Sequence, residues 1–306
     1  MARSAIPPHL LKQLERIEPG AHFSGKLPQV FSSSGKSYYA KCGSPREIEQ
    51  YVGEAESLKA MGSCRSWSSP FFNGEETESS EGSPFFVSEY REITPLTERT
   101  GAILGRRLAT EMHRYTSSKG YGFDVPTFCG ATRLRNGCVS THSYGILLST
   151  LTERRKYSEL CRKGQDVRTR RVFPLTLFVG AQAYYCRVIP ALLGPLQIKP
   201  VLLHGDLWSG NTGTDATTGE PVIFDPSSLY GHNEADLAIG RMFGGIPSSF
   251  FETYHQHMPK TEPAEQYDLR GDLYELFHYL NHTVLFGGGY ADSALRKMEK
   301  LLRVYS

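Results

Sequence analysis

The 306-residue chain lacks the hallmarks of several large protein classes. Its net charge is only +2 at pH 7, and no block of lysine and arginine marks it as a nucleic-acid-binding or membrane-surface protein. The most apolar stretch, 173–185, is too short and too interrupted to cross a bilayer. Residues 1–14 hold no continuous apolar segment of the signal-peptide kind. We therefore expect neither nucleic acid nor a membrane among its partners.

The sequence also lacks a Cys-x-x-Cys pair. Its six cysteines are widely spaced in a long chain, a pattern typical of reduced thiols and not of a disulfide framework. We therefore predict a cytoplasmic protein. The cysteines are Cys42, Cys64, Cys129, Cys138, Cys161 and Cys186.

What the chain does contain is an ordinary globular composition, 39% hydrophobic and 22% charged, long enough for one large domain or two lobes. The first hundred residues read as a small mixed lobe. Strands are predicted at 30–31, 37–41 and 84–90. A helix is predicted over 46–61, with Ser44 as N-cap, Pro45 in its first turn and Gly62 at its end. The polar stretch 73–83 reads as a solvated connector.

Helices dominate after residue 97. Helical periodicity is clear over 103–115 and 272–285, and Gly287–Gly289 is a natural helix stop. Two short apolar runs, 201–204 and 222–225, each end in polar residues. Many α/β active sites are assembled from short buried strands that end in functional groups.

The most informative segment is 204–211, HGDLWSGN, followed by FDP at 224–226. Asp206 and Asn211 are five residues apart, the spacing of the catalytic Asp and the metal-binding Asn in kinases. Asp225 ends the next strand, where a second metal-binding carboxylate belongs. The alternative is that these are ordinary turn formers, but the whole ordered set is much more specific than any one member.

The N-terminal half contains the other parts of a kinase site. Lys41 ends a strand like the one whose lysine holds the ATP phosphates, and Glu54 on the following helix is predicted to pair with it. Glu56, two residues on, faces elsewhere on the helix. Glu89 and Tyr90 lie where a hinge would bind adenine through its backbone.

At this point a family resemblance is clear. The segment 204–211 and the segment 224–238, FDPSSLYGHNEADLA, closely resemble the fructosamine-3-kinase (ketosamine-3-kinase) family. Residues 242–245 and 276–282 match its C-terminal pattern. The family is grouped with aminoglycoside phosphotransferases in the protein-kinase-like fold. The resemblance is strong from Lys199 onward and looser over 30–112.

This resemblance implies transfer of the ATP γ-phosphate, with Mg²⁺, to the sugar O3 of a ketosamine, either free or attached to a protein. The 3-phosphate is then eliminated, which frees the amine and repairs the glycated protein. It also implies that Trp208 stands where protein kinases carry a lysine. An indole fits the apolar face of a sugar, although simple packing of the loop is the alternative.

Three segments depart from the family. The turn 32–36, SSSGK, has a single glycine, and many relatives have a glycine-rich, cysteine-containing loop there. Residues 136–144 replace a tryptophan-rich acidic segment, within an altered region that runs to Arg155. Residues 171–186 read as an insertion, expected to pack peripherally. These departures raise the alternative of a catalytically impaired, kinase-like binding protein.

Two histidines on one helix, His278 and His282, have a spacing that could bind a metal. No third ligand is evident, so packing and hydrogen bonding are favoured. His204 is expected to brace the catalytic loop, and Asp236 to anchor it or to cap a helix.

We therefore predict an α+β, bilobal, protein-kinase-like enzyme with an N-terminal nucleotide-binding lobe at 1–93 and a mainly helical catalytic lobe at 94–306. Asp206 is the predicted base, and Asn211 and Asp225 are predicted to hold Mg²⁺. Lys41 is predicted to bind phosphate, and Glu54 to orient Lys41. A second enzyme hypothesis is a phosphotransferase acting on aminoglycosides, choline or another small alcohol. The sequence leaves the oligomeric state open.

Overall fold

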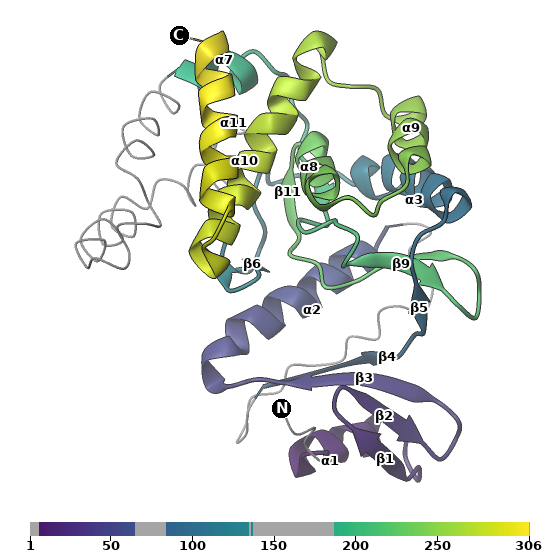
Figure 1. The fold of residues 1–306 in the computed structure, drawn as a ribbon. Coiled ribbons are helices and arrows are strands. Elements are labelled where there is room, and N and C mark those ends of the chain that lie inside the picture. The colour runs from purple at the N-terminus through teal and green to yellow at the C-terminus, as the bar shows by residue number, and fades with distance from the viewer. Residues whose placement is uncertain (1–5, 65–83, 135, 137–186, 306) are drawn as a thin grey trace, which may run out of the picture.

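The computed structural model describes residues 6–64, 84–134, 136 and 187–305, and the predicted fold class is confirmed. A β-rich N-terminal lobe lies below a larger, mainly helical C-terminal lobe (Figure 1). Several sequence expectations fall outside the described residues: the connector 73–83, the stretch 171–186, nearly all of 136–155, and Cys138, Cys161 and Cys186.

The N-terminal lobe is built on a four-stranded antiparallel sheet in the order β1-β2-β3-β4. Its alternating buried positions face helix α1 and form a small apolar core that includes Leu10, Leu14 and Val30. The predicted strands are all present. The bounds are α1 Pro8–Ile17, β1 Phe23–Lys26, β2 Gln29–Ser32, β3 Ser37–Cys42 and β4 Phe85–Glu89.

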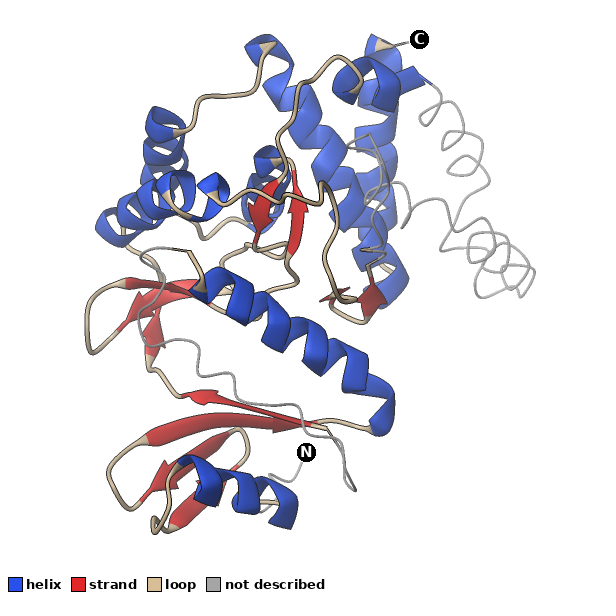
Figure 2. Cartoon of the chain, turned by 180° about the vertical axis from the view of Figure 1, so that it is seen from behind, coloured by secondary structure: helices blue, strands red, loops and turns tan. Residues whose placement is uncertain are grey.

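Helix α2 (Ile48–Gly62) lies between this sheet and the C-terminal lobe, as both ribbon views show (Figures 1 and 2). Its first turn differs from the prediction, because Pro45–Glu47 is a 3₁₀ turn and the α-helix begins at Ile48. Ser44 is nevertheless the cap: its backbone N–H donates to Glu47 Oε2 at 2.7 Å, in a capping box.

The loops of the C-terminal lobe connect short paired strands. Strand β5 pairs with β9, which pairs with β10, and β8 pairs with β11. Since β5 already belongs to a C-terminal sheet, we propose that the chain changes lobe between β4 and β5, close to the predicted boundary at 93. The bounds are β5 Ile93–Thr94, β6 Phe128–Cys129, β7 Thr132–Arg133, β8 Val201–Leu203, β9 Thr212–Asp215, β10 Pro221–Ile223 and β11 Leu229–Gly231.

Helices pack around these strands, and the two larger apolar clusters of the lobe lie among them. One lies between α10, α11 and α7, and the other between α3, α9 and the strands. The bounds are α3 Glu98–Thr110, α7 Ile189–Leu193, α8 Asn233–Phe243, α9 Ser248–His257, α10 Tyr267–Phe286 and α11 Tyr290–Val304, with 3₁₀ turns at Met112–Arg114 and Ala264–Gln266.

Two predicted helices begin earlier than their apolar periodicity suggested. Helix α3 starts at Glu98 because Thr97 caps it, its Oγ1 accepting from the Thr100 amide at 3.2 Å. Helix α10 starts at Tyr267 and not at Asp272. Its predicted stop is confirmed, because Gly287 has a φ of 66° and its amide bonds to the Thr283 carbonyl at 3.0 Å. Within the described ranges, no helix combines the length and apolar character of a membrane span.

Candidate active site

The segment 204–211 forms a loop directly after β8, and helix α8 fixes the start of this loop. Asp236 of α8 accepts the backbone N–H groups of His204 at 2.7 Å and Gly205 at 2.8 Å. Burial opposes the charge on Asp236, but hydrogen bonding and the nearby imidazole of His113 outweigh burial and lower the pKa of Asp236. A buried, ionised carboxylate therefore holds the loop backbone in place.

His204 ties the same loop to the end of β10. Its Nε2 lies 3.0 Å from the Phe224 carbonyl, and its Nδ1 accepts the Asp206 backbone N–H at 3.3 Å. Burial lowers the pKa of His204, so the ring is neutral and carries its proton on Nε2. The two segments singled out in the sequence, 204–211 and 224–226, are thus joined through one imidazole.

Asp206 lies at the centre of the loop and is half-buried. Its Oδ2 accepts from Asn211 Nδ2 at 3.0 Å, and Asn211 Nδ2 also donates to the Asp206 carbonyl at 3.0 Å. Burial raises the pKa of Asp206 to about 6, which brings this carboxyl close to the range where a general base works best. With Nδ2 turned toward Asp206, the Oδ1 of Asn211 is the atom left for a metal ion.

Asp225 follows β10 and has an unusual backbone. Its φ of 52° is the only positive φ at a non-glycine position in the described part of the chain. Such a conformation is costly and concentrates at functional sites. It places Oδ1 of Asp225 3.5 Å from Lys41 Nζ, so the C-terminal lobe meets the N-terminal lobe at this carboxylate.

Lys41 on β3 and Glu54 on α2 form the expected pair, with 2.6 Å between Nζ and Oε2. Burial works against the ammonium, but the carboxylates of Glu54 and Asp225 outweigh it and raise the pKa of Lys41 above its usual value. Glu56 points elsewhere and pairs with Lys59 at 2.9 Å, as the helical spacing predicted.

A cavity of about 250 Å³ opens between the lobes beside this cluster. Its lining includes Glu54, Asp225 and the backbone segment 88–91. The predicted hinge differs in one respect: the Tyr90 N–H donates to the Ser37 carbonyl at 2.9 Å, within the sheet. Backbone groups alternate in direction along a strand, so the Glu89 carbonyl faces the opposite edge of β4, where no described strand pairs with it. Of the two predicted hinge residues, Glu89 is therefore better placed than Tyr90 to bind adenine through its backbone.

Trp208 packs inside the loop. Its ring lies 5.4 Å from that of Phe243, and a Cβ on Gly210 would come within 2.3 Å of the indole. The side chain is half-buried. The structure therefore shows the packing role that the sequence left open, and contact with a sugar stays a prediction.

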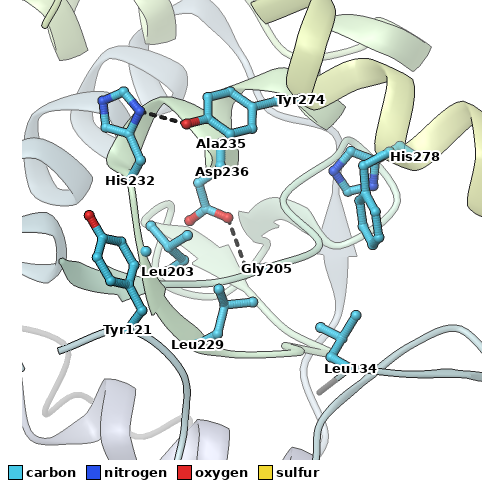
Figure 3. A pocket seen from close by; sticks show the side chains of 12 residues that line it. Tyr121, Leu134, Leu203, Gly205, Leu229, His232, Ala235, Asp236, Tyr274 and His278 are labelled. Carbon is cyan, nitrogen blue, oxygen red and sulfur yellow. Dashed lines mark hydrogen bonds between the residues drawn. The ribbon is translucent and has the colours of Figure 1, made fainter. Parts of the chain in front are cut away.

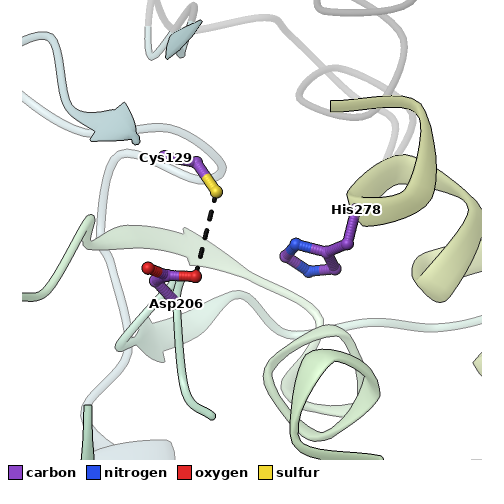
Figure 4. Close-up of side chains that lie close together, drawn as sticks. All are labelled: Cys129, Asp206 and His278. Carbon is purple, nitrogen blue, oxygen red and sulfur yellow. Dashed lines mark hydrogen bonds between the residues drawn. The ribbon is translucent and has the colours of Figure 1, made fainter. Parts of the chain in front are cut away.

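Two residues near Asp206 were not predicted from the sequence as parts of this site: Cys129 of β6 and His278 of α10 (Figure 4). Cys129 Sγ lies 3.9 Å from Asp206 Oδ1. Behind the loop, His278 also lines a cavity of about 60 Å³ with Gly205 and Asp236 (Figure 3). A cavity of that size holds a few water molecules at most and no sugar.

Comparison with known proteins places the chain among kinases. A family model described as fructosamine kinase matches residues 15–145 and 167–304. The chloroplastic protein-ribulosamine 3-kinase of Oryza sativa subsp. japonica is 36% identical over 284 residues, which cover 90% of this chain and 75% of that protein.

Two solved structures are similar in fold. One, assigned as a fructosamine-3-kinase from Haemophilus somnus, has a TM-score of 0.75 at 16% identity and covers 96% of both chains. The other, an apo thermostable mutant of an aminoglycoside phosphotransferase, has a TM-score of 0.58 at 14% identity, covering 96% of this chain and 98% of that one. Both support the protein-kinase-like fold predicted from the sequence.

The predicted insertion at 171–186 stays a prediction, and the family match bears on it only through its bounds. The family model matches this stretch as part of 167–304 and instead passes over 146–166.

Proposed function

Because this chain belongs to the fructosamine kinase family, we propose that it transfers the γ-phosphate of ATP to the sugar O3 of ketosamines. The acceptor is either a free ketosamine or one attached to a protein, and elimination of the 3-phosphate then releases the amine. The wide spacing of the six cysteines, with no Cys-x-x-Cys pair, supports a cytoplasmic location.

The observation that carries this proposal is the meeting of both lobes at one cluster of charges. Lys41 Nζ lies 2.6 Å from Glu54 and 3.5 Å from Asp225, and these two carboxylates line the inter-lobe cavity. Phosphoryl transfer depends mainly on positioning and on neutralising phosphate charge, and this arrangement of one cation and its carboxylate partners is suited to both.

In the proposed reaction, Asp206 orients the sugar hydroxyl and takes its proton as the new O–P bond forms and ADP leaves. A carboxyl with a pKa of about 6 is ionised at neutral pH and accepts that proton readily. Lys41 holds the phosphates, and Glu54 keeps Lys41 in position. His204 and Asp236 hold the loop that carries Asp206.

The residues present fit a magnesium ion. Asn211 Oδ1 and the Asp225 carboxylate are hard oxygen donors, which Mg²⁺ prefers, and the strained backbone of Asp225 turns its carboxylate toward Lys41. When bound, the ion supplies positive charge that offsets the phosphates. Asn211 and Asp225 are the residues that would hold it.

Two further contacts, one with adenine and one with the sugar, are proposed from the positions of the residues. The Glu89 carbonyl accepts from the adenine amine at the edge of β4, with Tyr90 keeping the strand in register through Ser37. Trp208 offers the exposed part of its indole to the apolar face of the sugar.

A substrate panel tests the proposal. ATP consumption is measured with fructosamine, ribulosamine and a glycated protein, and with an aminoglycoside and choline for the second enzyme hypothesis. Turnover with a ketosamine is expected, and should be lost in Asp206→Asn but kept in Asp124→Asn, which changes an exposed carboxylate. If Mg²⁺-ATP binds and no alcohol is phosphorylated, the chain is a kinase-like binding protein and the proposal fails.

A further inference from the structure

Three potential metal ligands from distant segments meet beside the catalytic loop. Cys129 Sγ, a carboxylate oxygen of Asp206 and a ring nitrogen of His278 all lie within 4.8 Å of one another (Figure 4). They come from β6, from the loop after β8 and from the middle of α10. Asn211 and Asp225, the proposed magnesium ligands, do not belong to this group.

The imidazole of His278 is an unexplained buried group. The residue is 5% exposed, and its Nδ1 has no hydrogen-bond partner among the described residues. A buried polar atom without a partner costs free energy and calls for an explanation. His282 is not part of the group, because its Nδ1 bonds to the His278 carbonyl at 2.8 Å.

The sulfur of Cys129 has a neighbour suited to a metal thiolate. Asn281 Nδ2 donates to Sγ at 3.3 Å, and it is held in that orientation by Thr132, whose hydroxyl donates to Asn281 Oδ1 at 2.5 Å. This N–H acts against burial and the Asp206 carboxylate, which together raise the pKa of the Cys129 thiol above its usual value, so the thiolate forms only when a metal ion displaces the proton.

We propose that Cys129, Asp206 and His278 form an inhibitory site for a thiophilic divalent cation such as Zn²⁺. One thiolate, one carboxylate and one imidazole are typical zinc ligands, whereas a thiolate disfavours Mg²⁺. With Zn–S of about 2.3 Å and Zn–O of about 2.0 Å, a tetrahedral ion needs sulfur and oxygen about 3.5 Å apart. The sulfur and oxygen, observed 3.9 Å apart, need only a small movement, and the His278 nitrogen, which lies within 4.8 Å of both atoms, has to move closer to them as the ion binds. The thiol proton passes to solvent as the ion binds.

Binding there would stop the proposed reaction, so the functional consequence rests on the proposed function. The ion occupies Oδ1 of Asp206, while Oδ2 keeps its bond to Asn211. A carboxylate bound to a metal cannot take the proton of a sugar hydroxyl. The fourth position of the ion remains for water or for an oxygen of the substrate.

The first experiment measures binding without any turnover. The full chain, freed of metal and supplied with excess Mg²⁺, is titrated with Zn²⁺ by calorimetry and with Co²⁺ by absorption spectroscopy. We expect one tight site and a thiolate-to-cobalt charge-transfer band. Cys129→Ser and His278→Gln should each weaken Zn²⁺ binding by at least about 10-fold. Cys42→Ser and His282→Gln are the matched controls and should leave binding unchanged.

The second experiment measures inhibition of turnover by Zn²⁺ at fixed Mg²⁺-ATP. Cys129→Ser should need at least about 10-fold more Zn²⁺ for half-inhibition than Cys42→Ser does. A band or an inhibition that persists in Cys129→Ser would place the ion on another thiol and overturn the site. If His278→Gln does not fold, the presence of the cobalt band in the wild-type chain and its loss in Cys129→Ser still test the site. A cobalt band in a chain without kinase activity would support the site and refute the proposed function instead.

Discussion

The carboxyl of Asp206 is held in surroundings that oppose its charge. Burial is the dominant influence on it, and the nearby carboxylates of Asp225 and Asp236 act in the same direction, while the bond from Asn211 works against both. The pKa of about 6 follows from this balance. A carboxyl of this kind is ionised at neutral pH and is still basic enough to accept a proton from the substrate.

Replacing Asp206 with asparagine should lower turnover by at least about 10²-fold and leave Mg²⁺-ATP binding largely intact, because the lost carboxylate acts on the acceptor. Turnover is measured by ATP consumption and binding by calorimetry. Near-normal turnover in Asp206→Asn would exclude Asp206 as the base.

The pH dependence of the reaction should report the same group. Since the pKa is raised to about 6, Asp206 gains a proton as the pH falls through that value. We expect kcat/KM to be flat near neutral pH and to fall with a slope of one below about pH 6. A profile still flat at about pH 5 would contradict the assignment.

The same shift has a consequence for stability. A carboxyl whose pKa is higher in the folded state than its usual 3.8 favours folding while protonated, and this contribution is lost as the pH rises through about 6. Asp206→Asn should therefore raise the melting temperature more at about pH 8 than at about pH 5. An equal gain at both values would show that burial does not disfavour the charge.

At the scale of elements, helix α2 connects the nucleotide side of the site to the catalytic lobe. Glu54 reaches Lys41 on the sheet, while Ser57 accepts the Ser228 amide at 3.0 Å in the other lobe. Gly53 lies directly against the chain at Pro126. The helix therefore sets the position of Lys41 relative to Asp225.

Removing the charge that Glu54 supplies should weaken ATP binding. Hydrogen bonds to charged groups contribute about 1.5–3 kcal/mol, so Glu54→Gln should raise the KM for ATP by about 10-fold or more. Glu56→Gln is the matched control on the same helix, because Glu56 pairs only with the exposed Lys59 among the contacts described for it. Equal KM values for the two variants would contradict the orienting role of Glu54.

The close approach of α2 to the catalytic lobe should tolerate no side chain at Gly53. A Cβ there would lie 2.3 Å from the Pro126 carbonyl oxygen, so Gly53→Ala should destabilise the fold by about 1–3 kcal/mol. Gly62, at the end of the same helix, has no neighbour within 4 Å of such a Cβ, and Gly62→Ala should be neutral or slightly stabilising. Urea unfolding measures both.

At the scale of the whole molecule, the inter-lobe cavity lies where groups from both lobes meet. A ligand bound there only by the folded state must stabilise the chain by mass action, by about 2.7 kcal/mol at a concentration about 100 times its Kd. Mg²⁺-ATP should therefore raise the melting temperature by several degrees. Asp225→Ala should remove that rise, and a rise of wild-type size in the variant would exclude Asp225 as the metal ligand.

The sequence by itself determined the fold class and the local motifs. Asp206 and Asn211 lie on one loop, and Asp225 follows the next strand. All three are close together in the sequence, so their spacing can be recognised without knowledge of the tertiary structure. The strands and the caps at Ser44 and Gly287 were also readable, because their chemistry lies within a few residues. Helix starts were less readable where a cap, such as Thr97, preceded the apolar period.

Only the tertiary structure decided which distant groups meet. Cys129 lies 77 residues before Asp206, and His278 comes from another helix, yet the three share one small region. The helical spacing of His278 and His282 gave no sign of Cys129 or Asp206, because a local pattern carries no trace of partners brought in by packing. The sequence favoured packing and hydrogen bonding for the two histidines, and His282 does bond to the His278 carbonyl. The Tyr90 amide was likewise fixed by pairing with Ser37 on another strand. Contacts of this kind depend on how the lobes and helices pack, which short-range sequence patterns do not encode.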